Sequence, residues 1–158
     1  MATGMPRLKI AAANPGVIHD AHGDLSFECN ADIHTAIPEG TYEVSFVRAE
    51  KKFLWKREKA FLHFVVQTLG GCNGVKLFMA CNIPPKGRWA MSSKYWRMWC
   101  LANGQRPLRA DRMSTTIFRN KIFLARVRTV RTSHNQIDLT PETQYSVIDE
   151  LLEVAAGR

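Results

Sequence analysis

The sequence predicts a mainly β protein with one or two helices, and three observations support this class. The segment Thr41–Arg48 alternates apolar and polar side chains with the period of two that a strand with one buried face produces. Further short segments rich in Phe, Val and Leu are separated by Gly and Pro. The clearest helix signal is a single stretch, Lys94–Ala102, in the middle of the chain. With 158 residues, the chain is long enough for one hydrophobic core.

Residues 1–38 predict an irregular N-terminal arm. They are rich in Ala, Asn, Gly and His, with Pro15 and Pro38 as breaks, and they show no sustained periodicity. One short strand is expected around Arg7–Ala11. Residues 39–158 then form the domain that holds the remaining regular elements.

This domain is expected to begin with strands that share one buried face. Residues 70–74 predict a turn, because Gly and Asn tolerate a positive φ. Ser92 or Ser93 is expected to cap the helix Lys94–Ala102, which Gly104 ends. The expected strands are Thr41–Arg48, Ala60–Gln67, Val75–Cys81 and Lys121–Arg131, with Gln144–Val154 either a fifth strand or a closing helix.

The order of these elements is the layout of an OB-like five-stranded barrel. Three strands in a meander are followed by a helix, a fourth strand and the final element. The loop Gln105–Arg112 and a helical turn capped by Ser114 connect the helix to the fourth strand. A generic five-stranded barrel, or a mixed sheet with one helix, gives the same pattern.

Positive charge is concentrated in the centre of the chain. Between Arg48 and Arg131 there are nineteen basic and three acidic residues, whereas residues 1–47 and 132–158 each carry a net charge of −4. Such a block repels itself unless a polyanion neutralises it, and phosphate backbones are the commonest polyanions in cells. We therefore expect a nucleic-acid-binding surface in this segment, in preference to charge that serves solubility alone.

Several other classes of protein are not expected. No apolar run approaches the roughly 18 residues of a membrane span, and there is no signal-peptide pattern, so a cytoplasmic protein without a membrane partner is predicted. An enzyme is not expected, because the basic segment has too few carboxylates for a metal-dependent nuclease and no phosphate-binding glycine loop. His63 is interpreted as a core residue, and no cofactor is predicted. The four cysteines are expected to be small buried residues: Cys29, Cys72, Cys81 and Cys100.

Four metal-ligating residue types lie close together in the N-terminal arm. They are His19, His22, Cys29 and His34. Their spacing matches no structural zinc module, so surface histidines are the preferred interpretation and no metal is predicted. A zinc-dependent enzyme built on this group remains a third alternative.

The most specific candidate site is the basic and aromatic segment between the first two predicted strands. Proteins that bind single strands combine cations, which contact phosphates, with aromatic rings on which bases stack. Phe53 and Trp55 share one face if this segment is extended, and Trp55 is the preferred stacking residue; the alternative is that both rings cap the core. The predicted phosphate contacts here are Lys51, Lys52, Lys56 and Arg57.

The fourth predicted strand and its neighbours supply further candidates. Arg126 and Arg128 lie on the face opposite the predicted core face, and they either contact phosphates or pair with acidic neighbours such as Glu43 or Asp149. Arg106, Arg109 and Arg112 are expected to close over the bound strand as a mobile loop. In the helix, Trp96 and Trp99 are expected in the core, and Lys94, Tyr95 and Arg97 at the rim of the site.

Residues Pro38 to Val154 resemble the single-stranded-DNA-binding OB-fold proteins of phages and plasmids. The segments that carry the resemblance are Pro38–Tyr42, Phe61–Phe64, Gly74–Leu77, Ser93–Tyr95 and Asn120–Lys121. The resemblance implies a homo-oligomer that acts with partner proteins in DNA replication or recombination. The chain departs from it in ending Leu151–Arg158, without the acidic tail that recruits such partners.

The predicted function is therefore non-catalytic binding of single-stranded DNA with little sequence preference, with RNA as a second candidate ligand. The alternative is an assembly subunit of a nucleoprotein complex that binds RNA or an acidic protein. Burial of Trp55 would favour this alternative.

Overall fold

The computed structural model describes residues 17–19, 25–27, 35–86 and 88–157, which belong to two compact units, 1–33 and 34–158. In the first unit, β1 (Val17–His19) pairs antiparallel with β2 (Leu25–Phe27). No strand was predicted at these positions from the sequence. The strand predicted at Arg7–Ala11 lies outside the described residues.

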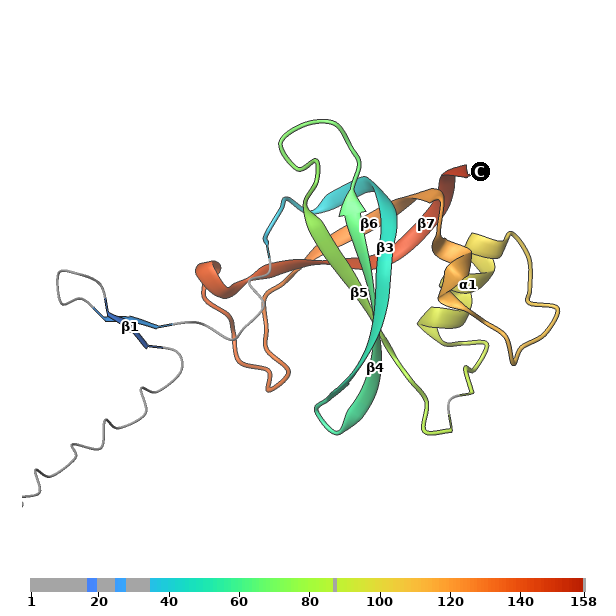
Figure 1. Ribbon diagram of the computed structural model, residues 1–158, viewed down its shortest axis with the longest axis horizontal. Coiled ribbons are helices and arrows are strands. Elements are labelled where there is room, and N and C mark those ends of the chain that lie inside the picture. The colour runs from blue at the N-terminus through green and yellow to red at the C-terminus, as the bar shows by residue number, and fades with distance from the viewer. Residues whose placement is uncertain (1–16, 20–24, 28–34, 87, 158) are drawn as a thin grey trace, which may run out of the picture. The chain divides into compact units, whose positions relative to one another are not determined.

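The second unit contains one antiparallel sheet of five strands in the order β5-β4-β3-β6-β7 (Figure 1). The mainly β class with one α-helix is therefore confirmed, and the final element is a strand. Hydrogen-bonded ladders join the neighbours in this order but do not join β5 to β7 in the described chain, so the sheet is open where a closed barrel was predicted. The strands are β3 (Gly40–Leu54), β4 (Arg57–Val66), β5 (Lys76–Asn82), β6 (Lys121–Val130) and β7 (Tyr145–Gly157).

The β3–β4 hairpin is longer than predicted. Its strands continue to Leu54 and Arg57, which pair with each other, and only Trp55 and Lys56 form the turn. Both turn residues have positive φ, 50° and 62°, as a tight hairpin turn requires. Figure 1 shows β3 as a long curved strand, and a β-bulge between Phe46 and Arg48 shifts its register.

The core forms on one face of the sheet. Phe123, Ala125 and Val127 of β6 are buried, whereas Arg126 and Arg128 are exposed, so the predicted orientation of this strand is confirmed. Alternate residues of β4 and β5 face the same core. These residues are Leu62, Phe64, Val66, Leu77, Met79 and Cys81.

The helix α1 (Lys94–Asn103) has the predicted position and caps. The Ser93 hydroxyl accepts a hydrogen bond from the Trp96 amide (3.2 Å), and Gly104 ends the helix with φ 76°. The predicted helical turn after Ser114 is the 3-10 helix η1 (Thr115–Phe118); a second one, η2 (Pro141–Thr143), precedes β7.

The aromatic residues of α1 are placed differently from the prediction. Trp99 is buried as predicted, and its indole N–H donates to the Ser114 carbonyl (3.0 Å), whereas Trp96 is only half-buried. Tyr95, predicted at the rim, is buried instead: its ring stacks on Trp89 (4.3 Å between centroids) and its hydroxyl donates to the Met113 carbonyl (2.6 Å). This burial raises the pKa of Tyr95 to about 12.

The described cysteines lie in or against the core, and the predicted burial is confirmed for Cys81. Cys81 is buried, and burial raises the pKa of its thiol to about 11; Cys72 and Cys100 are half-buried. Cys29 lies outside the described residues. In the part of the chain that the structure describes, no helix combines the length and the apolar character needed to span a membrane.

Candidate nucleic-acid interface

A cavity of about 460 Å³, called the groove from here on, lies along the seam between β5 and β7. The tip of the β3–β4 hairpin and the loop 131–144 between β6 and β7 also line it. Its lining combines aromatic rings with cationic side chains. The lining residues are Leu54, Trp55, Lys59, Phe61, Phe78, Ala80, Lys94, Arg128, Val130, Thr132, Ser133, His134, Tyr145, Val147 and Ile148.

Trp55 stands at the tip of the hairpin with 51% of its surface exposed, so it does not cap the core. Its ring stacks on His134 of the loop 131–144, with 4.8 Å between centroids. The ammonium group of Lys59 lies 4.4 Å from the centre of the indole ring, within the range of a cation–π interaction. The indole is therefore held in place by two neighbours while half of the residue faces solvent.

Three further rings line the groove from β4, β5 and β7. Phe61 and Phe78 pack on the face opposite the core, with 5.5 Å between their ring centroids. Phe78 also stacks on Tyr145 with nearly parallel planes and 6.2 Å between centroids. Lys52 adds a cation 5.7 Å above the Phe61 ring. The rings of Phe78 and Tyr145 thereby connect the two end strands of the sheet, which no ladder joins.

The cations of the groove differ in their surroundings. Lys94, the first residue of α1, is half-buried, and desolvation lowers the pKa of its amine; the nearby Cys81 and Asp149 act in the opposite direction. Arg128 is exposed and its Nε donates to the Asp149 carboxylate at 3.1 Å. Of the predicted residues, the structure brings Trp55, Lys94 and Arg128 together in the groove.

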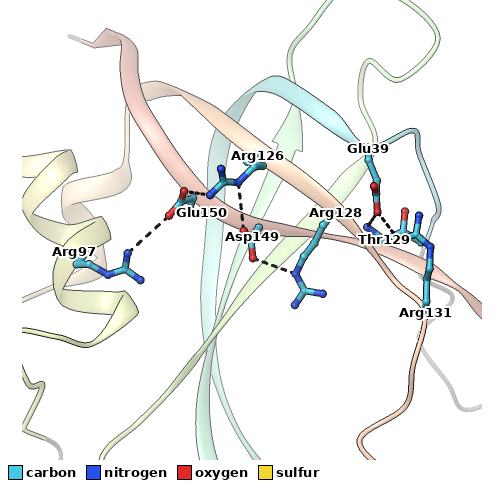
Figure 2. A network of polar contacts seen from close by, with 8 residues as sticks. All are labelled: Glu39, Arg97, Arg126, Arg128, Thr129, Arg131, Asp149 and Glu150. Atoms are coloured by element: carbon cyan, nitrogen blue, oxygen red, sulfur yellow. Dashed lines mark hydrogen bonds and ion pairs between the residues drawn. The ribbon is translucent and has the colours of Figure 1, made fainter. Parts of the chain in front are cut away.

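The arginines on the outer face of β6 belong to a network of ion pairs (Figure 2). Arg126 contacts both Glu150 and Asp149, the latter at 3.4 Å, and Arg97 lies 3.8 Å from Glu150. Pairing with Asp149 is the alternative that the sequence analysis left open. Arg126 does not line the groove, so a direct phosphate contact by Arg126 would require it to exchange carboxylate partners.

Figure 2 also shows a separate pair at the start of β3. One carboxylate oxygen of Glu39 accepts from the Thr129 backbone N–H (2.9 Å) and lies 3.0 Å from Arg131. The Thr129 N–H is the main reason that the pKa of Glu39 lies below its ordinary value. This contact fixes the start of β3 against the end of β6.

Three other predicted residues of the hairpin line a second cavity, of about 640 Å³. Phe53, Lys56 and Arg57 are part of its lining. The expectation that Phe53 and Trp55 share one face is wrong, because Trp55 lies in the turn, where the alternation of an extended strand ends. Phe53 is 70% exposed and therefore does not cap the core either.

Lys51 and Lys52 form ion pairs within the hairpin. Lys51 lies 2.9 Å from Glu58, and Lys52 lies 3.0 Å from Glu50. His63 is on the outer face of β4, where it bonds to Glu50 (2.8 Å), so its predicted place in the core is wrong. The pKa of Glu50 falls to about 2, chiefly through its hydrogen bond from Arg48.

The arginines of the loop 105–112 do not meet the other predicted residues. In Figure 1 this loop lies on the side of α1 away from the sheet. Arg109 pairs with Asp111 (2.8 Å) and, with Arg112, lines a small separate cavity of about 220 Å³. Arg106, Arg109 and Arg112 line neither the groove nor the second cavity, so the structure gives no support to a loop that closes over the strand.

Most residues of the groove were not predicted from the sequence. Lys59, Phe61, Phe78, His134 and Tyr145 were not predicted as site residues. One signal was present: β4 carries large apolar residues on both faces, although a sheet with one buried face needs them on only one. His134 and Tyr145 gave no such signal, because only the fold brings them beside the hairpin.

The four potential metal ligands of the N-terminal arm lie largely outside the described residues. His22, Cys29 and His34 are not described, and only the backbone of His19 is. Elsewhere in the described chain, no group of three or more His, Cys, Asp or Glu residues is arranged to hold a metal ion. Comparison of the chain with known protein families, with curated proteins and with solved structures finds no match.

Proposed function

We propose that this chain binds single-stranded DNA without catalysis, using the groove to stack bases and the surrounding cations to contact phosphates. The observation that carries the proposal is the half-exposed Trp55, supported from two sides by Lys59 and His134 at the mouth of an aromatic groove. Stacking on such rings accepts every base, so little sequence preference is expected.

The domain itself is proposed to be an OB-like, partly open barrel. An OB fold has five strands, and it binds oligonucleotides on its second and third strands and on the loops that follow its first and fourth strands. Counting from β3, those parts are β4, β5, the β3–β4 hairpin and the loop 131–144, and all four contribute to the groove. The order β5-β4-β3-β6-β7, with α1 between β5 and β6, supports the same assignment.

The electrostatic part of the proposal depends on six cations near the hairpin and the groove. They are Lys52, Lys56, Arg57, Lys59, Lys94 and Arg128. If these cations neutralise about six phosphates of a single strand, raising the salt concentration from low to moderate should lower the affinity by about 10²–10³. The exposure of Trp55 favours stacking over the alternative of an assembly subunit, for which a buried Trp55 was expected.

Fluorescence anisotropy with labelled oligo-dT, its duplex and the matching RNA, over a series of salt concentrations, tests the proposal. We expect preference for the single strand, quenching of tryptophan emission on binding, and a steep fall of affinity with salt. Equal binding to single and double strands without quenching would reject base stacking and favour the assembly subunit. No binding to any of the three would reject nucleic acid as the ligand.

A further inference from the structure

The groove and the second cavity lie on opposite faces of the β3–β4 hairpin. On each strand near the tip, one residue lines the second cavity and the next lines the groove: Phe53 and Leu54 on β3, and Glu58 and Lys59 on β4. Phe53 and Glu58 are opposite each other in the strand pairing and therefore share a face. This alternation follows from the period of two in a strand. The start of α1 also lies between the cavities, because Ser93 lines the second cavity and Lys94 the groove.

The second cavity combines the same kinds of side chain as the groove. It has an exposed aromatic ring, Phe53, and two cations, Lys56 and Arg57. Among the described residues that line it, Glu58 is the acidic one, and Lys51 lies 2.9 Å from that carboxylate. The lining is completed by uncharged residues: Asn82, Ile83, Pro84, Pro85, Ala90 and Ser93. An anionic ligand with flat apolar groups therefore suits this cavity as it suits the groove.

We propose that the second cavity continues the path of the nucleic acid: a bound single strand leaves the groove, crosses the hairpin tip and places a further base against Phe53. Lys56 and Arg57 contact the phosphates at the crossing. This inference rests on the proposed function, and it adds a second subsite on the opposite face of the hairpin.

The two subsites imply that the effect of Phe53 depends on the length of the ligand. The groove offers five rings and the second cavity one, so a short oligonucleotide binds in the groove. A longer strand reaches both subsites; OB folds cover from about 4 to about 16 nucleotides. Phe53 should therefore matter only for the longer strand.

The experiment compares oligo-dT of about 4 and about 16 nucleotides by fluorescence anisotropy at one salt concentration. Phe53→Ala should lower the affinity for the long strand about tenfold and leave the short strand within about twofold of wild type. Trp55→Ala should lower the affinity for both the short and the long strand. In a salt series, Arg57→Ala should reduce the slope for the long strand only.

Leu69→Ala is the matched control, because Leu69 is 93% exposed and lies beyond the end of β4 that is remote from the hairpin tip. This variant should bind both lengths like wild type. If Trp55→Ala weakens binding but Phe53→Ala changes neither length, the continued path is wrong and the proposed function stands. Equal weakening of both lengths by Phe53→Ala would also overturn the second subsite. Wild-type protein that binds neither length would overturn both proposals.

Discussion

The Trp55 side chain is ordered by its neighbours although about half of the residue is exposed. The contacts with His134 and Lys59 hold its ring at the edge of the groove before any ligand is present. A side chain that is already ordered loses less conformational entropy on binding than a free one. We therefore expect the indole to contribute through stacking and not through charge.

Replacement of Trp55 by Ala separates these two contributions. The affinity for oligo-dT should fall by about tenfold or more, since one stacked base contributes about 1–3 kcal/mol. The dependence of log Kd on log salt concentration should keep its wild-type slope, because no cation is removed. Anisotropy over a salt series measures both quantities. A changed slope with unchanged affinity at low salt would contradict the role of Trp55.

Asp149 is expected to lower the affinity for nucleic acid, because its carboxylate pairs with Arg128 and Arg126. Asp149→Asn should raise the affinity for oligo-dT and steepen its salt dependence, since Arg128 loses its carboxylate partner and becomes available to phosphates, whereas Arg126 keeps its pair with Glu150. Asp111→Asn is the control, because Asp111 pairs with Arg109 outside the groove. We predict a larger gain in affinity for Asp149→Asn than for Asp111→Asn, measured by anisotropy. Equal gains for the two variants would indicate a general effect of net charge.

At the scale of elements, α1 and β6 could be predicted from local signals, whereas the β3–β4 hairpin could not. Capping residues bound α1, and apolar alternation gives the core face of β6. The hairpin extends beyond the core, where no apolar alternation is needed, and its turn uses Trp55 and Lys56 in place of the Asn-Gly pair that predicts such turns. Its strands therefore looked like a polar loop.

The hairpin should weaken in acid through Glu50. This carboxylate faces Arg48, Lys52 and His63, and its pKa is lowered from 4.5 to about 2. A lowered pKa means that the charged group stabilises the folded chain above pH 4.5 and that this contribution disappears as the pH falls toward 2.

Urea unfolding of wild type and Glu50→Gln at several pH values tests whether the charge of Glu50 stabilises the folded chain. The difference in the free energy of unfolding should be largest above pH 4.5 and should shrink as the pH approaches 2. Glu153→Gln, on the exposed part of β7, is the control and should behave like wild type. A difference for Glu50→Gln that does not change with pH would contradict the role of its charge.

The stability of α1, the helix that begins at Lys94, can be tested through its N-terminal cap. The sequence left Ser92 and Ser93 as alternatives, and the structure shows Ser93 accepting from Trp96 N. Ser93→Ala should therefore lower the free energy of unfolding by about 1 kcal/mol, and Ser92→Ala should change it little. Urea denaturation measures both. A larger effect of Ser92→Ala than of Ser93→Ala would indicate that Ser92, and not Ser93, caps the helix.

At the scale of the whole molecule, charge predicts an anionic ligand, and the fold determines which of the basic residues lie together. The basic segment from Arg48 to Arg131 was predicted to hold the binding surface. It includes residues of the groove, but also Arg106 and Arg112, which do not line it. The loop 131–144, outside this block, supplies His134. These contacts between distant segments arise from the pairing of strands, which composition and local periodicity do not encode.

The salt dependence of oligo-dT binding, compared with that of duplex binding, is the decisive test of whether this chain binds single strands by stacking and charge. We predict tighter binding to the single strand, quenching of tryptophan emission, and a fall in affinity of about 10²–10³ between 50 and 200 mM salt. Binding that is insensitive to salt, or equal for duplex and single strand without quenching, would contradict this prediction.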